Sequence, residues 1–121
     1  MTSVRFFNEP GRSRLEEYRW LKENRPQEMA SLRDAITLLV KDPDRAEHDF
    51  SVWLGDPKAR WLVMPFRAPD GIKCLVWRHA PDGGDEIEIA HFQQAWGDEL
   101  PRPRFWLEER PDYPAAGRYR V

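Results

Sequence analysis

The sequence predicts a mixed α/β domain: a short strand and a helical hairpin, then an antiparallel sheet of three to four strands. Apolar residues at helical spacing come first, and three runs of strand-forming residues follow. Pro-Asp-Gly turns join consecutive runs and favour tight hairpins. The 121 residues suffice for one domain with a single core. We therefore expect one domain over residues 1–100, with a proline-rich tail over 101–121 packed on or near the sheet.

The first part of the chain carries the helical signals. "SVRFF", residues 3–7, is typical of a short strand that "NEPG" ends. A first helix is predicted over residues 12–24, and "NRP" ends it because the residue before a proline avoids the helical region. Pro26 suits the first turn of a second helix. That helix has one apolar face, formed by Met29, Leu32, Ile36, Leu39 and Val40, and "KDP" ends it.

The second part of the chain carries the strand signals. Residues 44–58 are predicted to be irregular, with "DFSVWLG" as a candidate short strand inside them. Three strands are then predicted from "RWLVMPFR", "IKCLVWRH" and "DEIEIAHF". After them, "QQAWGDEL" is interpreted as a short helix.

The strand register decides which side chains share a face. If "APDG" is a four-residue turn, Arg67 opposes Ile72. One face is then expected to hold Trp61, Val63, Cys74, Val76, Ile87, Ile89 and His91. The other is expected to hold Leu62, Met64, Phe66, Lys73, Leu75, Trp77 and His79, with Glu86 and Glu88 as its solvated part. The hairpin covers only one face, so we expect the Leu62 face to be covered by Phe105, Trp106 and Tyr113 of the tail, or by a partner.

Composition limits the classes of function. Nineteen basic and twenty-one acidic residues give a net charge of −2, whereas a nucleic-acid-binding domain normally has a basic excess. Six tryptophans favour an aromatic surface for a protein partner. One cysteine and three histidines give no zinc set, and no cofactor is expected. Cys74 is interpreted as a buried structural thiol.

No apolar stretch reaches membrane-spanning length, and no signal-peptide pattern is present at the N-terminus. We therefore expect a cytoplasmic protein that does not contact a membrane.

Several stretches, read in order, resemble the RelE/ParE superfamily of type II toxin–antitoxin toxins. "VRFF" stands where that family has its first strand, and "RLEEYRWLKENRPQEMASLRDAITLLVKDP" is similar to its helical hairpin, most of all in the ParE branch. "RWLVMPFR" and "IKCLVWRH" resemble the central strand hairpin, and "EIEIAHF" resembles the closing strand. The resemblance spans residues 3–92. The chain departs from it in "HFQQAW", which lacks the arginine or tyrosine common after the last histidine, and in its acidic balance.

The resemblance implies candidate catalytic residues for the case that the chain cleaves RNA. His91 would be a general acid or base, or would orient a phosphate, since its ordinary pKa is near neutrality. Lys73 stands near the position of a family arginine, and Arg60 and Arg67 would add positive charge around the phosphate. The alternative is structural: His91 closes a core face beside Cys74, and the cations keep the strand edges soluble.

The candidate partner-binding residues are apolar. They are Leu62, Met64, Phe66, Trp77 and Trp106. The resemblance implies that an antitoxin covers such a surface with an extended or helical segment, and that oligomers form through it. The exposed, basic side of the first helix is a second candidate for target contact, although its interleaved glutamates are also typical of a solvated face.

Three functions remain open. The first is ParE-like inhibition of DNA gyrase by binding, neutralised by a cognate antitoxin. The second is RelE-like, ribosome-dependent cleavage of messenger RNA. The third is a non-enzymatic immunity protein or phage-encoded inhibitor on a similar scaffold, because a fold does not determine a function.

Overall fold

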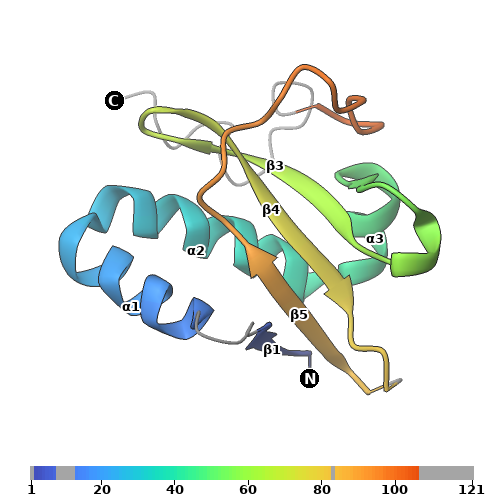
Figure 1. Cartoon of the computed structure of the whole chain (residues 1–121), viewed down its shortest axis with the longest axis horizontal. Helices are drawn as coiled ribbons and strands as arrows, with labels where there is room; N and C mark the ends of the chain where they lie inside the picture. Colours follow the sequence, from blue (N-terminus) through green and yellow to red (C-terminus); the bar gives the residue numbers. More distant parts are fainter. Residues whose placement is uncertain (1, 8–12, 83, 107–121) are drawn as a thin grey trace.

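The strands form one five-stranded sheet with helices packed on one side (Figure 1). The structure is a computed structural model that describes residues 2–7, 13–82 and 84–106. The elements are β1 (Ser3–Phe6), α1 (Arg14–Asn24), α2 (Pro26–Lys41), α3 (Pro43–Asp49), β2 (Val52–Trp53), the 3₁₀ turn η1 (Pro57–Ala59), β3 (Leu62–Ala68), β4 (Gly71–His79) and β5 (Glu86–His91). The mixed α/β class is confirmed.

The strand order is β1-β5-β4-β3-β2. β1 runs parallel to β5, and the other neighbours are antiparallel. The sheet is wider than the predicted three to four strands because β1 and the short β2 both join it, one at each edge.

The predicted helical hairpin is present. The Ser13 hydroxyl accepts a hydrogen bond from the Glu16 N–H, so α1 begins at Arg14 rather than near residue 12. Pro26 occupies the first turn of α2, as expected. The buried face of α2 contains Met29, Leu32 and Leu39. The apolar spacing of this helix therefore identified its core side correctly.

Two segments differ from their predicted form. The stretch after "KDP" was expected to be irregular, but it forms α3: Asp42 accepts a hydrogen bond from the Arg45 N–H, and Pro43 sits in the first turn. The predicted short helix "QQAWGDEL" does not form: the chain bends at Gln93 and Gln94, and Ala95 makes an antiparallel β-bridge with Lys73. There the Cys74 N–H donates to the Gln94 carbonyl and the Trp96 N–H donates to the Ile72 carbonyl, both at 2.8 Å.

The predicted turn register is confirmed, because Arg67 pairs with Ile72. The predicted faces of β5 are wrong for Ile87, Ile89, Glu86 and Glu88, whereas His91 lies opposite Val76 as expected. Val76 pairs with His91 while its neighbour Trp77 pairs with Ile89, so the register shifts by a β-bulge between them. As a result Ile87 and Ile89 lie on the face of Trp77, and Glu86 and Glu88 lie on the other face.

The main core lies between the sheet and the helices. Leu62, Met64, Phe66 and Trp77 are buried there beside Leu32 and Leu39 of α2. The expectation that the tail or a partner must cover this face is therefore wrong, because α2 covers it. Phe105 and Trp106 close the edge of this same core: the Phe105 N–H donates to the Asp49 carbonyl at 2.8 Å, and its ring lies 6.3 Å from Phe50. Tyr113 lies outside the described residues.

A smaller apolar cluster occupies the opposite face of the sheet. Val63, Cys74, Val76 and Ala90 are buried there, with Phe7, Trp61, Trp96 and Leu100 packed around them. The segment after β5 thus contributes to both sides, since Trp96 also contacts the main core. In Figure 1 this orange segment leaves β5 and runs past one end of β3 and β4. No helix among the described residues is both long and apolar enough to span a membrane.

Candidate functional site

Lys73 is held by acidic residues on the helix side of the sheet. It pairs with Phe66 across β3 and β4, and Phe66 faces the helices. Its ammonium lies 3.4 Å from the Asp70 carboxylate and 3.7 Å from that of Glu28 on α2. The Lys73 side chain is only 13% exposed, so both ion pairs are partly shielded from water. Its charge is therefore already balanced within the protein.

His91 lies on the opposite face of the sheet from Lys73. It pairs with Val76, whose side chain belongs to the smaller apolar cluster beside Cys74. Arg60 is exposed in the loop before β3, with a left-handed φ of 62° at the end of η1. Arg67 is near the other end of β3. The structure therefore does not bring the four candidate catalytic residues into one site.

The candidate partner-binding residues lie in the interior. Leu62, Met64, Phe66 and Trp77 are each at most 2% exposed, and Trp106 is 8% exposed. The first four are therefore inaccessible to a partner in the folded chain, whereas Trp106 keeps a small exposed fraction at the core edge. Among the described residues, large apolar side chains that reach the surface include Leu15, Trp20, Trp53 and Leu54. Periodicity did not single out Trp20, Trp53 or Leu54, because each stands in a short or polar segment, and it placed Leu15 on the apolar side of the first helix.

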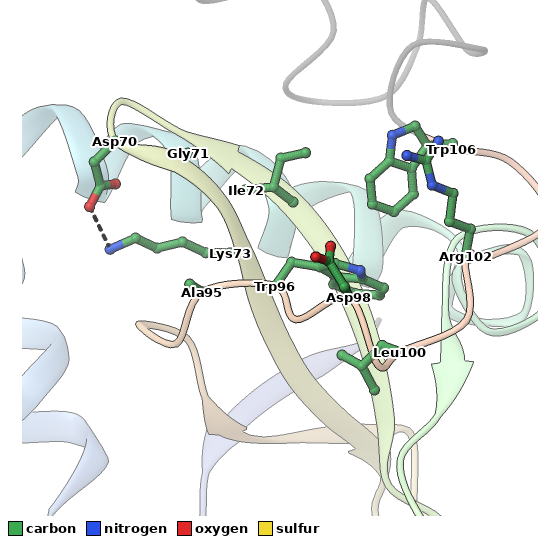
Figure 2. A pocket seen from close by; sticks show the side chains of 10 residues that line it. All are labelled: Asp70, Gly71, Ile72, Lys73, Ala95, Trp96, Asp98, Leu100, Arg102 and Trp106. Carbon is green, nitrogen blue, oxygen red and sulfur yellow. Dashed lines mark ion pairs between the residues drawn. The ribbon is translucent and has the colours of Figure 1, made fainter.

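A cleft lies between the β3–β4 turn and the chain after β5. It measures about 660 Å³, which is in the roughly 300–1,000 Å³ range of ligand-binding clefts. Its walls include Ile72, Trp96, Asp98 and Trp106. Figure 2 shows Arg102 against the Trp106 ring at one end and the Lys73–Asp70 ion pair at the other.

An aromatic wall forms one end of this cleft. The Trp96 and Trp106 rings meet edge to face, with centroids 5.5 Å apart. The Arg102 guanidinium carbon lies 4.4 Å from the centre of the Trp106 ring, within the distance of a cation–π interaction. Two features of the sequence mark this wall, the paired prolines around Arg102 and the tryptophans themselves. They were missed because residues 93–100 were expected to be helical.

A second hollow shares Lys73 with this cleft. It measures about 240 Å³ and is lined by Trp20 and Leu21 of α1, Arg25, Glu28 and Gln93. Arg25 lies 5.9 Å from the Trp20 ring centre and 3.3 Å from the Glu28 carboxylate. The Lys73–Glu28 ion pair therefore stands between an exposed tryptophan of the helical hairpin and the larger cleft.

Cys74 is a buried thiol beneath the segment after β5, and its predicted burial is confirmed. Burial raises its pKa to about 11, and the negative charge of Glu99 adds to this rise. A hydrogen bond from the Gly97 backbone opposes it in part. Because the thiolate is the nucleophile, Cys74 is not suited to nucleophilic catalysis at neutral pH.

No group of three or more histidine, cysteine or acidic residues within residues 2–7, 13–82 and 84–106 is placed to hold a metal ion. Comparisons with protein-family models, curated proteins and solved structures found no match to this chain.

Proposed function

We propose that this chain acts by binding a protein target, as a ParE-like inhibitor of DNA gyrase that a cognate antitoxin neutralises. The observation that carries the choice of binding over catalysis is the separation of Lys73 from His91 by the sheet. RNA cleavage needs a proton-transfer group and a cation at the same phosphate. Here the cation also faces two carboxylates, which compete with any phosphate.

The order of the elements supports the same proposal. The resemblance implies a first strand, a helical hairpin and then a strand meander, and the chain has β1, the α1–α2 hairpin and β3-β4-β5 in that order. The outer side of α1 offers a contact surface, with Trp20 half exposed among charged residues. A gyrase inhibitor acts in the cytoplasm, where we place the chain.

Growth and supercoiling assays test the proposal together. Expression without an antitoxin should arrest bacterial cells, and the purified chain should inhibit supercoiling by gyrase in vitro. Lys73→Ala and His91→Ala should still arrest growth and inhibit supercoiling, since neither residue has a catalytic role in this proposal. Trp20→Ala should weaken both effects. Trp53→Ala, at a similarly exposed position on the far edge of the sheet, is the matched control. Normal growth at high soluble expression would count against the toxin function.

The alternatives give different results in the same assays. A RelE-like ribonuclease would cut ribosome-bound messages and would lose toxicity with Lys73→Ala or His91→Ala. An immunity protein or phage-encoded inhibitor would leave growth and supercoiling unaffected and would have no neighbouring antitoxin gene. The net charge of −2 favours that class over the ribonuclease.

A further inference from the structure

The outer edge of β2 is open to another strand. β2 ends the sheet beyond β3, with Trp53 opposite Leu62. The Leu54 N–H donates to the Trp61 carbonyl at 3.0 Å. Since hydrogen-bonded and non-hydrogen-bonded pairs alternate in an antiparallel ladder, the N–H and C=O of Trp53 point away from β3. Among the described residues, no hydrogen bond from outside the β2–β3 ladder reaches these two groups.

The side chains at this edge are large and apolar. Trp53 is 45% exposed and Leu54 is 38% exposed. They lie on opposite faces of the sheet, because Leu62 opposite Trp53 faces the helices and Leu54 is one residue further along. Val52, on the same face as Leu54, packs against the smaller apolar cluster. Soluble proteins commonly protect an edge strand with charged side chains or with proline, and neither stands at residues 52–54.

A second copy of the chain matches this edge by two-fold symmetry. Because Trp53 offers both an outward N–H and an outward C=O, an antiparallel pair centred on it forms two equivalent hydrogen bonds. The two Trp53 rings then lie side by side on the face that the helices cover. On the other face, Val52 of each copy lies opposite Leu54 of the other. Each apolar side chain of the edge thus gains an apolar neighbour.

The charges on the two sides of β2 are complementary in such a pair. Antiparallel pairing places the chain before one β2 beside the chain after the other. Residues 41–49 carry one excess negative charge when Arg104, which pairs with the last residue of α3, is counted with them. Residues 55–60 carry one excess positive charge. It comes from Lys58 and Arg60, whose side chains form no ion pair within the part of the chain that the structure describes.

We propose that two copies of this chain associate through their β2 edges and join their five-stranded sheets into one. The strands pair antiparallel, with Trp53 of one copy opposite Trp53 of the other. Only a few residues of each copy meet, so the interface is smaller than the roughly 1,200 Å² of stable complexes. The dissociation constant should therefore be on the order of 100 µM. At low micromolar concentration the chain is then a monomer, and unfolding measurements there report on the monomer.

This dimer goes beyond gyrase inhibition and does not depend on it. In Figure 1 the segment between α3 and β3 lies on the opposite side of the molecule from α1. Trp20 on α1, the proposed target contact, thus stays accessible in the dimer. Substitution of Trp53 is therefore expected to break the dimer and to leave target binding unchanged.

Analytical ultracentrifugation measures the association. The wild-type chain should shift from monomer to dimer between about 10 µM and about 1 mM. Trp53→Ala should raise the dissociation constant at least about tenfold, because both copies lose the central ring. Trp20→Ala, which removes a similarly exposed ring on α1, is the matched control and should leave the constant unchanged. Lys58→Glu should weaken the dimer several-fold, whereas Lys22→Glu, at an exposed position on α1, should not.

Disulfide cross-linking tests the register. In the proposed pair, the Cα atoms of Val52 in one copy and Leu54 in the other are about 4.5 Å apart, which a disulfide can span. Two copies of the same residue are roughly 7–8 Å apart, which is too far. A mixture of Val52→Cys and Leu54→Cys chains should therefore cross-link under mild oxidation, and neither variant should do so alone. The wild type, with its buried Cys74, should not cross-link either.

Several results would overturn the proposal. They are a chain that stays monomeric up to about 1 mM, equal effects of Trp53→Ala and Trp20→Ala, and equal effects of Lys58→Glu and Lys22→Glu. Cross-linking of one cysteine variant alone, as strong as that of the mixture, would also contradict it. A monomer whose β2 edge binds an extended segment of another protein would assign the edge to that partner instead of a second copy.

Discussion

The Trp77 indole N–H donates a hydrogen bond to the Ser51 hydroxyl at 3.0 Å, inside the main core. Trp77 is fully buried and Ser51 is nearly so. The bond joins β4 to the residue just before β2, and so it fixes the edge of the sheet beside α3. A buried indole N–H without an acceptor keeps its full desolvation cost.

Ser51→Ala should therefore destabilise the protein by about 1–3 kcal/mol, the cost of an unsatisfied buried donor. Urea unfolding followed by circular dichroism measures this free energy. Thr37→Ala removes an exposed hydroxyl bonded to the Arg33 carbonyl, and it should change stability by about 0.5 kcal/mol or less. Equal effects of the two substitutions would show that the Trp77 donor finds another acceptor.

Glu88 connects two arginines on the face of the sheet away from the helices. Its carboxylate lies 2.9 Å from Arg78 Nε and 3.3 Å from Arg5 Nε, and the residue is buried. Its hydrogen bond is the main reason why the pKa of Arg5 is raised. Arg78 in turn stacks on Trp61 at 4.2 Å. One carboxylate thus orders side chains from three strands and the loop before β3.

Glu88→Gln keeps the shape of the side chain and removes its charge. It should therefore lower the free energy of unfolding by about 1.5–3 kcal/mol, the usual contribution of hydrogen bonds to charged groups. Glu86→Gln, at the more exposed neighbour that also faces Arg5, should cost at most about 1 kcal/mol. Thermal unfolding at low and high salt measures both. The loss from Glu88→Gln should persist in high salt, since buried pairs are screened less, and its disappearance would show that the pair is exposed.

The sequence predicted local features of this fold better than the pairing of its last strand. The buried side of α2 and the Arg67–Ile72 pairing follow from helical periodicity and from turn length, which act over a few residues. The bulge near Val76 leaves no such local pattern, and it moved Ile89 and Glu88 to the opposite faces from those expected. α3 was missed because "KDP" ends one helix and also caps the next.

The cleft could not be predicted for a related reason. Its residues come from the β3–β4 turn and from residues 95–106, which meet only because the chain after β5 pairs with the start of β4. The four candidate catalytic residues were grouped because of the family resemblance and because of their residue types. Their separation depends on which face of the sheet each side chain occupies, and this face follows only from the strand register.

Trp106 joins the main core although it belongs to the predicted tail. Trp106→Ala should cost about 3 kcal/mol, near the lower end of values for tryptophan truncation in a core, because its ring lies at the core edge. Trp53→Ala, at a largely exposed position, should cost about 0.5 kcal/mol or less. Urea unfolding measures both variants. A matching small effect for Trp106→Ala would mean that residues 101–106 unfold separately from the sheet.

Cys74 makes stability depend on pH in the alkaline range. Burial raises its pKa from the ordinary 9.0 to about 11, so between these values the unfolded chain loses the thiol proton and the folded chain keeps it. The unfolded state then binds fewer protons, and stability falls as pH rises. The contribution of the protonated thiol to the free energy of unfolding is complete below pH 9. A pKa shift of this size lowers that free energy by about 2–3 kcal/mol by pH 11.

Cys74→Ala should remove this part of the pH dependence, although the smaller side chain lowers stability at every pH. The measurement is the free energy of unfolding in urea under reducing conditions, at several pH values from 8 to about 11. The difference between wild type and Cys74→Ala should shrink as pH rises, because only the wild type carries the titrating thiol. Native Cys74 should also react slowly with iodoacetamide near pH 8, since the thiolate is the reactive form. A constant difference across the range, together with fast alkylation of the folded protein, would show that the thiol is not held in the apolar cluster beneath the segment after β5.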